Sequence, residues 1–256
     1  MVNLIRMDLY RVLKSRAFLI RLLLTFVLML AAGPVEKALF LFASSVSADL
    51  QEPFAAEVNL SGILSDPFAG MGLMLALISL VSFFHADVEN GYIKNIAGQV
   101  PSKGLTVVSK FIAAAVHNLI FALAGILGSV IGTLLVRRIV MDSAVLDSLR
   151  VFVLKLMLAQ SLSVLLLLAV NTLRNKSLGM VLAVLFGLGL TFLIYMGISE
   201  GLSKLLGTNV DISEYMPDSV MGENPLDTVK ALTVSIVASA VCLIPAVRIF
   251  DLKDVR

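Results

Sequence analysis

Six long apolar stretches, each nearly free of charged residues, constrain this chain more than any other feature. They lie at residues 17–35, 68–86, 110–136, 156–173, 177–199 and 231–247. A helix needs about 20 apolar residues to cross a hydrocarbon core of roughly 30 Å, and the stretches are about that long. Because only 15% of the residues are charged, a water-soluble fold would lack the polar side chains to cover its surface. The sequence therefore predicts an all-α polytopic membrane protein with six transmembrane helices in one domain, residues 1–256.

The N-terminal 16 residues have the pattern of an amphipathic helix. Five apolar residues share one helical face: Val2, Ile5, Leu9, Val12 and Leu13. The basic residues Arg11 and Lys14 lie away from that face, so we expect residues 1–16 to form an interfacial helix that lies flat on the membrane. The alternative is a secretory signal over residues 1–33, although its charged segment is long for a signal and includes Asp8.

The charges between the stretches predict that both termini are cytoplasmic. Six spans place both ends on one side, and with that side inside, the inner segments carry 13 basic and 5 acidic residues. The outer segments then carry 7 basic and 13 acidic residues, which follows the positive-inside tendency. Arg137 and Arg138 are the exception because they lie outside in this topology, where Asp142 and Asp147 partly offset them.

The sequence disfavours several classes of enzyme. It contains no Gly-Lys dipeptide, so the G-x-x-x-x-G-K-[ST] loop of an ATPase is absent. The two histidines, His85 and His117, lie in different stretches and cannot form H-E-x-x-H, and the single cysteine excludes an internal disulfide. A formal G-x-S-x-G match at residues 197–201 ends an apolar stretch that holds neither histidine, so we read it as coincidence. We expect no enzymatic activity, catalytic residue, metal or cofactor in this chain.

Uncharged polar side chains inside the stretches are candidates for a translocation path. The candidates are His117, Asn118, Gln160 and Asn171. Polar groups in hydrocarbon usually bond to neighbouring helices, so contact between helices is the alternative role. No acidic residue lies deep in a stretch, which disfavours transport driven by intramembrane carboxylates. Gly128 and Gly132 are four residues apart and predict close helix packing, within or between subunits.

An acidic segment follows the fifth stretch. Between residues 200 and 227 the only basic residue is Lys204, and the acidic ones are Glu200, Asp211, Glu214, Asp218, Glu223 and Asp227. Such a run is typically a solvated surface. The alternative is that an acidic outer rim attracts cationic peptides near the exit of a transport path.

The segment between the second and third stretches carries the most informative pattern. Val88, Tyr92, Ile93 and Ile96 recur at helical spacing, and Gly98 then favours a turn. A short helix with an aromatic on its apolar face and charges at its rim is typical of a protein contact. The alternative is a turn that packs on its own helix ends. The predicted helix comprises Asp87, Val88, Glu89, Asn90, Gly91, Tyr92, Ile93, Lys94, Asn95 and Ile96.

These residues also carry a resemblance to a known family. An acidic residue, Asp87, lies at the exit of the second stretch. After it come Glu89-Asn90-Gly91-Tyr92-Ile93-Lys94-Asn95, then Pro101-Ser102-Lys103 and Ser109-Lys110. The N-terminal segment contributes Asp8-Leu9-Tyr10-Arg11-Val12-Leu13-Lys14-Ser15. With six stretches and both ends inside, this pattern resembles the ABC-2 type permeases of bacterial ABC transporters.

The resemblance implies a subunit that exports a substrate across the bacterial cell membrane. In that family two permeases, identical or related, pair above two separate ATPase subunits that hold ATP and Mg. Carried onto this chain, the coupling helix that sits in a groove of the ATPase is residues 87–96. The smaller members export antimicrobial peptides such as lantibiotics, or drugs. Membrane lipid is a further expected partner, and nucleic acid is not. The alternatives are a stand-alone secondary transporter and a structural membrane subunit.

Overall fold

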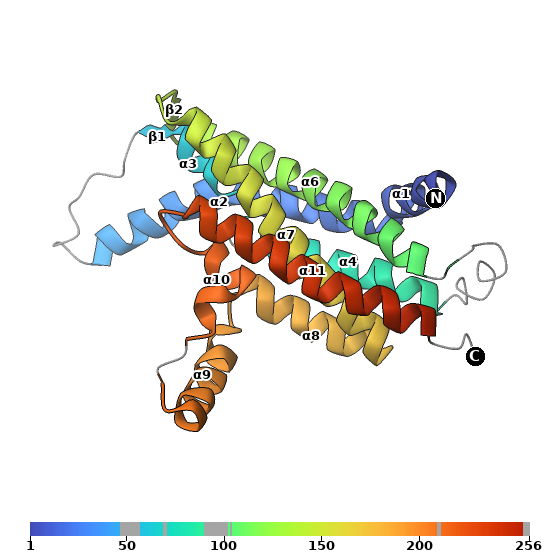
Figure 1. Ribbon diagram of the computed structural model, residues 1–256. Helices are drawn as coiled ribbons and strands as arrows, with labels where there is room; N and C mark the ends of the chain where they lie inside the picture. Colours follow the sequence, from blue (N-terminus) through green and yellow to red (C-terminus); the bar gives the residue numbers. More distant parts are fainter. Residues whose placement is uncertain (47–56, 69–70, 90–101, 103, 209–210, 253–256) are drawn as a thin grey trace.

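The computed structural model describes residues 1–46, 57–68, 71–89, 102, 104–208 and 211–252 (Figure 1). Its α-helices are α1 (Val2–Lys14), α2 (Arg16–Val46), α3 (Leu60–Ser65), α4 (Gly72–Glu89), α6 (Gly104–Leu134), α7 (Val145–Leu173), α8 (Lys176–Gly187), α9 (Phe192–Leu206), α10 (Pro217–Met221) and α11 (Thr228–Leu252). A 3-10 turn, η1, spans Ser213–Tyr215, and two three-residue strands, β1 (Glu57–Asn59) and β2 (Arg138–Val140), pair in parallel with Val58 opposite Ile139. The predicted all-α class is confirmed.

The long helices lie side by side and give the bundle two distinct ends (Figure 1). One end, here called the terminal end, carries α1, the last turn of α4, the first turn of α6 and the last turn of α11. The opposite end, here called the sheet end, carries β1, β2 and α3, and α9 projects away from the bundle. The N-terminal helix and the last turn of the C-terminal helix α11 therefore lie at the same end of the bundle.

Four of the six predicted spans are single helices that are long and apolar enough to cross a membrane. They are the segments Arg16–Ala43, Gly104–Leu134, Val145–Leu173 and Thr228–Asp251. The second stretch forms α4, whose apolar part, Gly72–Ala86, is shorter. The fifth stretch forms α8 and α9, which are bent by 90° and add a fifth span if they are counted together. The structure thus supports a multi-pass membrane protein with four to five candidate spans, and the count of six is not confirmed.

The fifth stretch breaks at residues 188–191 for a local reason. Gly189 adopts a φ of +67°, in the left-handed region where a glycine has no steric penalty. The amide of Leu190 then donates to the carbonyl of Leu185 at 2.9 Å, a bond that closes the end of a helix. The hydroxyls of Thr191 and Tyr195 both donate to Asp218, which holds the start of α9. Hydropathy alone does not reveal this turn, because Leu188, Gly189 and Leu190 continue the apolar stretch and Thr191 is its one polar residue.

The core surrounds α4, in which every residue of Gly72–Ala86 is buried or half-buried. Leu77, Leu80, Val81 and Phe84 have no exposed surface. Helices α2, α6, α7 and α8 all pack against α4. By contrast, α2 and α11 present many large apolar side chains on the outside of the bundle, where water would disfavour them and lipid would not. The central helix is therefore the one that leads into the predicted coupling segment.

Glycines bring α2 and α6 into close contact, as the spacing of Gly128 and Gly132 predicts. A Cβ atom at Gly132 would lie 2.3 Å from the carbonyl oxygen of Leu30, and one at Gly128 would lie 2.6 Å from that of Phe26. Both neighbours are backbone atoms of α2, which runs past the predicted end of the first stretch to Val46. The predicted close packing is confirmed, and the contact lies within the chain.

Candidate functional site

The predicted coupling residues begin in the last turn of α4. Asp87, Val88 and Glu89 belong to this helix, and residues 90–96 lie outside the described residues. Glu89 is exposed, and its carboxylate accepts a hydrogen bond at 3.4 Å from the ammonium of Lys176 at the start of α8. The end of α4 is therefore joined to α8 at the point where the predicted segment begins.

The chain re-enters the bundle at α6, whose first turn is held by α11. The Oδ1 atom of Asp251 accepts hydrogen bonds from the Gly104 amide at 2.7 Å and the Ser102 hydroxyl at 2.9 Å. A Cβ at Gly104 would lie 2.7 Å from Cγ1 of Val247, so a larger residue does not fit there. A carboxylate that accepts the first amides of a helix satisfies donors that have no partner within it. Asp251 thus joins the last turn of α11 to the start of α6.

The next turn of α6 is bonded to two further helices. The Ser109 hydroxyl donates to Oδ2 of Asp8 on α1 at 2.6 Å, and both side chains are buried. Asp8 also lies 3.5 Å from the guanidinium of Arg11. The ammonium of Lys110, which is 2% exposed, donates to the Phe84 carbonyl on α4 at 3.3 Å. Hydrogen bonds between charged groups and buried partners are the stronger ones in proteins.

Together these contacts define a coupling frame, the set Asp8, Glu89, Ser109, Lys110, Lys176 and Asp251 with their partners. It joins α1, α4, α6, α8 and α11 at the terminal end, on both sides of residues 90–101. Neither Asp8 nor Asp251 is among the site residues that the sequence predicts. An acid inside an otherwise basic N-terminal helix was a usable signal for Asp8. No sequence signal marks Asp251, because its partner is 147 positions away.

Two of the four predicted path residues meet inside the bundle. The Asn118 amide donates to Oε1 of Gln160 at 3.1 Å and to the Ser163 hydroxyl at 2.8 Å, which joins α6 to α7. Gln160 in turn donates to the Phe111 carbonyl at 2.9 Å. These bonds link α6 to α7 and favour the role in helix contact, although Oδ1 of Asn118 is buried without a hydrogen-bond partner among the described residues. A largely apolar groove of about 580 Å³ between α6, α7 and α11 nevertheless reaches both side chains.

His117 and Asn171 do not line this groove. The His117 ring is buried, stacks on Phe121 with centroids 4.4 Å apart, and meets Phe18 edge-on at 5.4 Å. Asn171 is buried two residues before the end of α7. The four predicted residues therefore do not line one continuous cavity in the part of the chain that the structure describes.

Most acids of the segment 200–227 are engaged in local contacts. Glu200 pairs with Lys204 at 2.7 Å, Glu223 pairs with Lys230 at 2.5 Å, and Asp227 accepts from the Val229 amide. Asp218 holds α9, and hydrogen bonds from the Ser213 hydroxyl and amide lower the pKa of Asp211. These partners favour a structural role for the segment over a rim that attracts cationic peptides.

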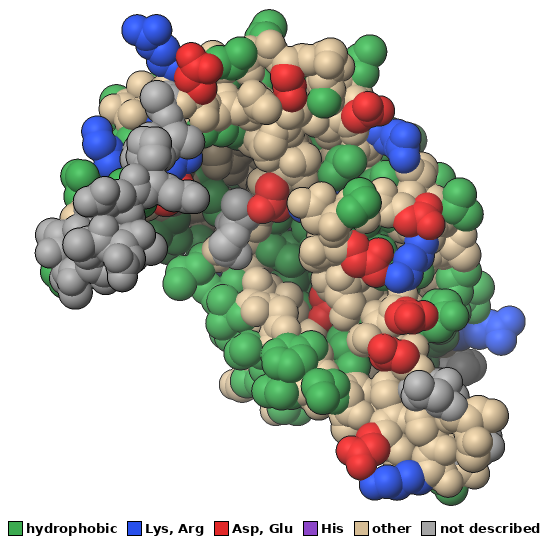
Figure 2. All heavy atoms as spheres, turned by 90° about the vertical axis from the view of Figure 1, so that its left-hand side faces the viewer, with side chains coloured by type: hydrophobic (Ala, Val, Ile, Leu, Met, Phe, Trp, Pro, Cys, Tyr) green, Lys and Arg blue, Asp and Glu red, His purple; other side chains and the backbone are tan. Residues whose placement is uncertain are grey.

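The sheet end carries closely mixed acidic and basic side chains (Figure 2). Arg137 pairs with Glu36 at 2.8 Å, and Lys155 pairs with Asp66 at 3.2 Å. Arg137 thus has an acidic partner on α2, in addition to the nearby Asp142 and Asp147 that were expected to offset its charge partly. Asp142 accepts a hydrogen bond from the Ser61 hydroxyl. The sequence separation of 101 residues between Arg137 and Glu36 hides this pair from local inspection.

Replacing Asp251 with alanine is expected to loosen the first turn of α6. Loss of a carboxylate that caps a helix costs about 1 kcal/mol, which corresponds to roughly fivefold faster local opening. Hydrogen exchange at the amides of residues 104–107 measures this directly. Asp227→Ala is the matched control because Asp227 accepts from the Val229 amide at the other end of the bundle. Equal exchange at residues 104–107 in both variants contradicts the assignment of Asp251.

No family model and no curated protein matches this chain. Among the described residues no group of three or more His, Cys, Asp or Glu side chains is placed to hold a metal ion.

Proposed function

We propose that this chain is the membrane permease subunit of an ABC-2 type exporter. In this proposal it pairs with a second permease, identical or related, and is driven by separate ATPase subunits. Residues 87–96 are the coupling helix, and the cargo is an antimicrobial peptide or a drug. The absence of a phosphate-binding loop in the sequence and the resemblance of residues 87–110 to this family support the proposal.

The observation that carries the proposal is the coupling frame. The two helices that flank residues 90–103 are α4, which lies at the centre of the core, and α6, whose first turns are bonded to α1, α4 and α11. A displacement applied to the segment between them is therefore applied to most of the bundle at once. Packed helices respond to such a displacement as rigid bodies, because a close-packed core does not deform continuously.

The mechanism that follows is mechanical. ATP binding closes the ATPase pair, the docked segment moves with it, and α4 and α6 carry the motion through the membrane. Tyr92 and Ile93 are the anchors of the contact, and charges such as Lys94 are its rim. A central anchor typically contributes more than a rim charge, and its truncation costs about 2 kcal/mol or more.

The proposal also specifies an arrangement in the membrane. The terminal end faces the cytoplasm, because the segments assigned to that side carry the excess of basic residues. Helix α4 is the second crossing, and the bent pair of α8 and α9 is the fifth, which gives six spans. Helix α1 lies along the inner surface of the bilayer.

Tyr92→Ala and Ile93→Asp are expected to abolish ATPase binding while the chain stays folded. The tagged chain is purified from native membranes, and the eluate is assayed for ATP hydrolysis and for a copurifying protein with a phosphate-binding loop. Tyr215→Ala is the matched control, because Tyr215 is an exposed tyrosine in η1, outside the terminal end.

Two results overturn the proposal. One is unchanged copurification of the ATPase with the Tyr92 and Ile93 variants. The other is cargo flux in vesicles that contain this chain alone, driven by an ion gradient without ATP, which identifies a secondary transporter.

A further inference from the structure

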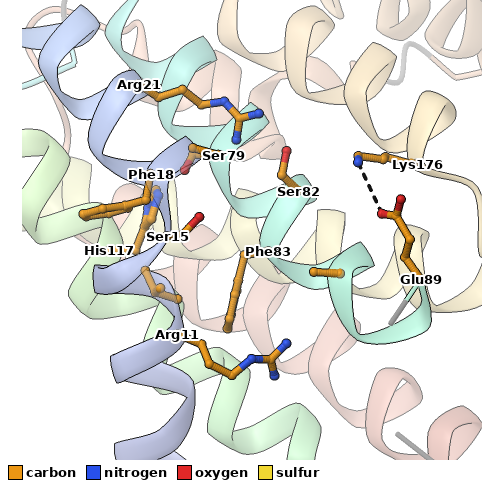
Figure 3. A pocket seen from close by; sticks show the side chains of 13 residues that line it. Arg11, Ser15, Phe18, Arg21, Ser79, Ser82, Phe83, Glu89, His117 and Lys176 are labelled. Carbon is orange, nitrogen blue, oxygen red and sulfur yellow. Dashed lines mark hydrogen bonds and ion pairs between the residues drawn. The ribbon is translucent and has the colours of Figure 1, made fainter. Parts of the chain in front are cut away.

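A pocket of about 300 Å³ lies between α1, α2, α4 and α8 near the terminal end (Figure 3). Arg11 comes from α1, Arg21 from α2 and Lys176 from α8, and all three line it. Figure 3 shows Arg11 and Arg21 on opposite sides of the pocket and Lys176 on a third side. Hydroxyls from Ser15, Ser79 and Ser82 lie among the cations. Three helices thus bring cations to one cavity, and α4 adds the hydroxyls of Ser79 and Ser82.

The charges around the pocket leave one positive charge in excess. Lys176 is paired with Glu89 at 3.4 Å, and Arg11 lies 3.5 Å from Asp8. Among the described residues, the guanidinium of Arg21 has neither a hydrogen bond nor an ion pair. A cation inside a candidate membrane span is costly unless an anion or water meets it. The pocket therefore fits a ligand group with a single negative charge and several acceptor oxygens.

The depth of the pocket matches the headgroup region of a bilayer. Arg21 lies five residues after the start of α2 at Arg16, about 7.5 Å along the helix axis. Leu24 and Leu28 follow Arg21 on the same stripe of α2 and are exposed, so an apolar surface continues from the pocket toward the bilayer centre. Phe18 and Phe83 line the apolar side of the pocket. A ligand with an anionic head and an apolar tail meets both surfaces.

We propose that this pocket binds the phosphodiester of one anionic phospholipid, with Arg21 as its central contact and an acyl chain along Leu24 and Leu28. A lipid phosphodiester and a free phosphate ion share one binding chemistry, a phosphate oxyanion held by guanidinium and hydroxyl donors. A free phosphate ion has the same headgroup chemistry but no apolar part. Basic pockets between membrane helices on the cytoplasmic side are suited to anionic lipids, which are enriched in that leaflet. The pocket shares Glu89 and Lys176 with the coupling frame, but lipid binding to it can be measured without the ATPase partner.

The test measures lipid that stays bound through purification. The full chain is reconstituted in nanodiscs of phosphatidylcholine with phosphatidylglycerol, extracted in a neutral detergent, and examined by native mass spectrometry. Wild type is expected to retain one phosphatidylglycerol. Arg21→Gln is expected to bind it about tenfold more weakly, because a charge-assisted hydrogen bond is lost. Arg138→Gln, an exposed arginine at the sheet end, is the matched control and is expected to retain the lipid.

Further variants and ligands separate the possible outcomes. Arg21→Lys keeps the charge and is expected to retain more lipid than Arg21→Gln. Should Arg21→Gln not fold, Lys176→Gln at the half-exposed rim is expected to weaken retention in the same direction. Equal retention of phosphatidylcholine, or equal loss in Arg138→Gln, overturns the proposal. Displacement of the lipid by millimolar inorganic phosphate also overturns it and identifies a site for a soluble anion.

Discussion

Gly132→Ala is expected to destabilise the bundle more than one added methyl group usually does. The new Cβ would lie 2.3 Å from the Leu30 carbonyl oxygen and 3.0 Å from the Leu30 Cα, both of them backbone atoms of α2. Backbone cannot rotate away as a side-chain tip does, so the whole of α2 must move from α6. Overpacking of a closely packed site costs about 1–3 kcal/mol of folding free energy, and we expect the cost of Gly132→Ala to lie near the upper end of that range.

Gly201→Ala is the matched control for this experiment. Gly201 lies within α9, and an added Cβ meets nothing within 4 Å. Alanine is favoured over glycine inside a helix by about 1 kcal/mol, so this variant is expected to keep or raise stability. The measurement is the temperature at which half of the detergent-solubilised protein elutes as a single species in size-exclusion chromatography. Equal temperatures for the two variants contradict the close contact of α2 with α6.

The outcome at the glycines illustrates what the sequence predicts well. Apolar stretches of sufficient length identified four helices that are able to cross a membrane, because that requirement is local and depends on about 20 consecutive residues. The spacing of Gly128 and Gly132 identified a contact face for the same reason. The partner of that face was not predictable, since Leu30 lies about 100 positions away and nothing near Gly132 specifies it.

The turn at Gly189 illustrates what the sequence does not predict. Hydropathy reports burial in lipid and carries no information on chain direction, so an apolar turn with one left-handed glycine reads as continuous helix. In the candidate site, too, contacts between distant residues were not predictable. The sequence placed Glu89 just beyond the second stretch, in a separate helix, whereas the structure has it as the last residue of α4. Its contact with Lys176 and the bond from Gly104 to Asp251 depend on tertiary packing.

Lys110→Glu is expected to have the second large effect, because it reverses a buried charge within the coupling frame. The Lys110 ammonium donates to the Phe84 carbonyl at 3.3 Å and lies 5.7 Å from the centre of the Phe83 ring. Phe84 is close to the C-terminal end of α4, where the helix dipole favours a positive charge. A carboxylate in the same place faces a carbonyl oxygen and a negative dipole end, at a cost of about 3–5 kcal/mol. The measurement is the yield and melting temperature of the solubilised chain.

Lys110→Met separates the role of the charge from that of the volume. Methionine is flexible and apolar and fills much of the same space, so this variant is expected to fold with a cost below about 1.5 kcal/mol. Lys204→Glu controls for charge reversal alone, because the Lys204 side chain is 74% exposed, and its effect is expected to be small. A melting temperature for Lys110→Glu equal to that of Lys204→Glu contradicts the buried contact.

If Lys110→Met folds and binds the ATPase but no longer couples ATP hydrolysis to transport, the bond between α6 and α4 transmits the motion. If coupling is intact, this bond contributes to stability alone, and transmission depends on the other contacts of the frame.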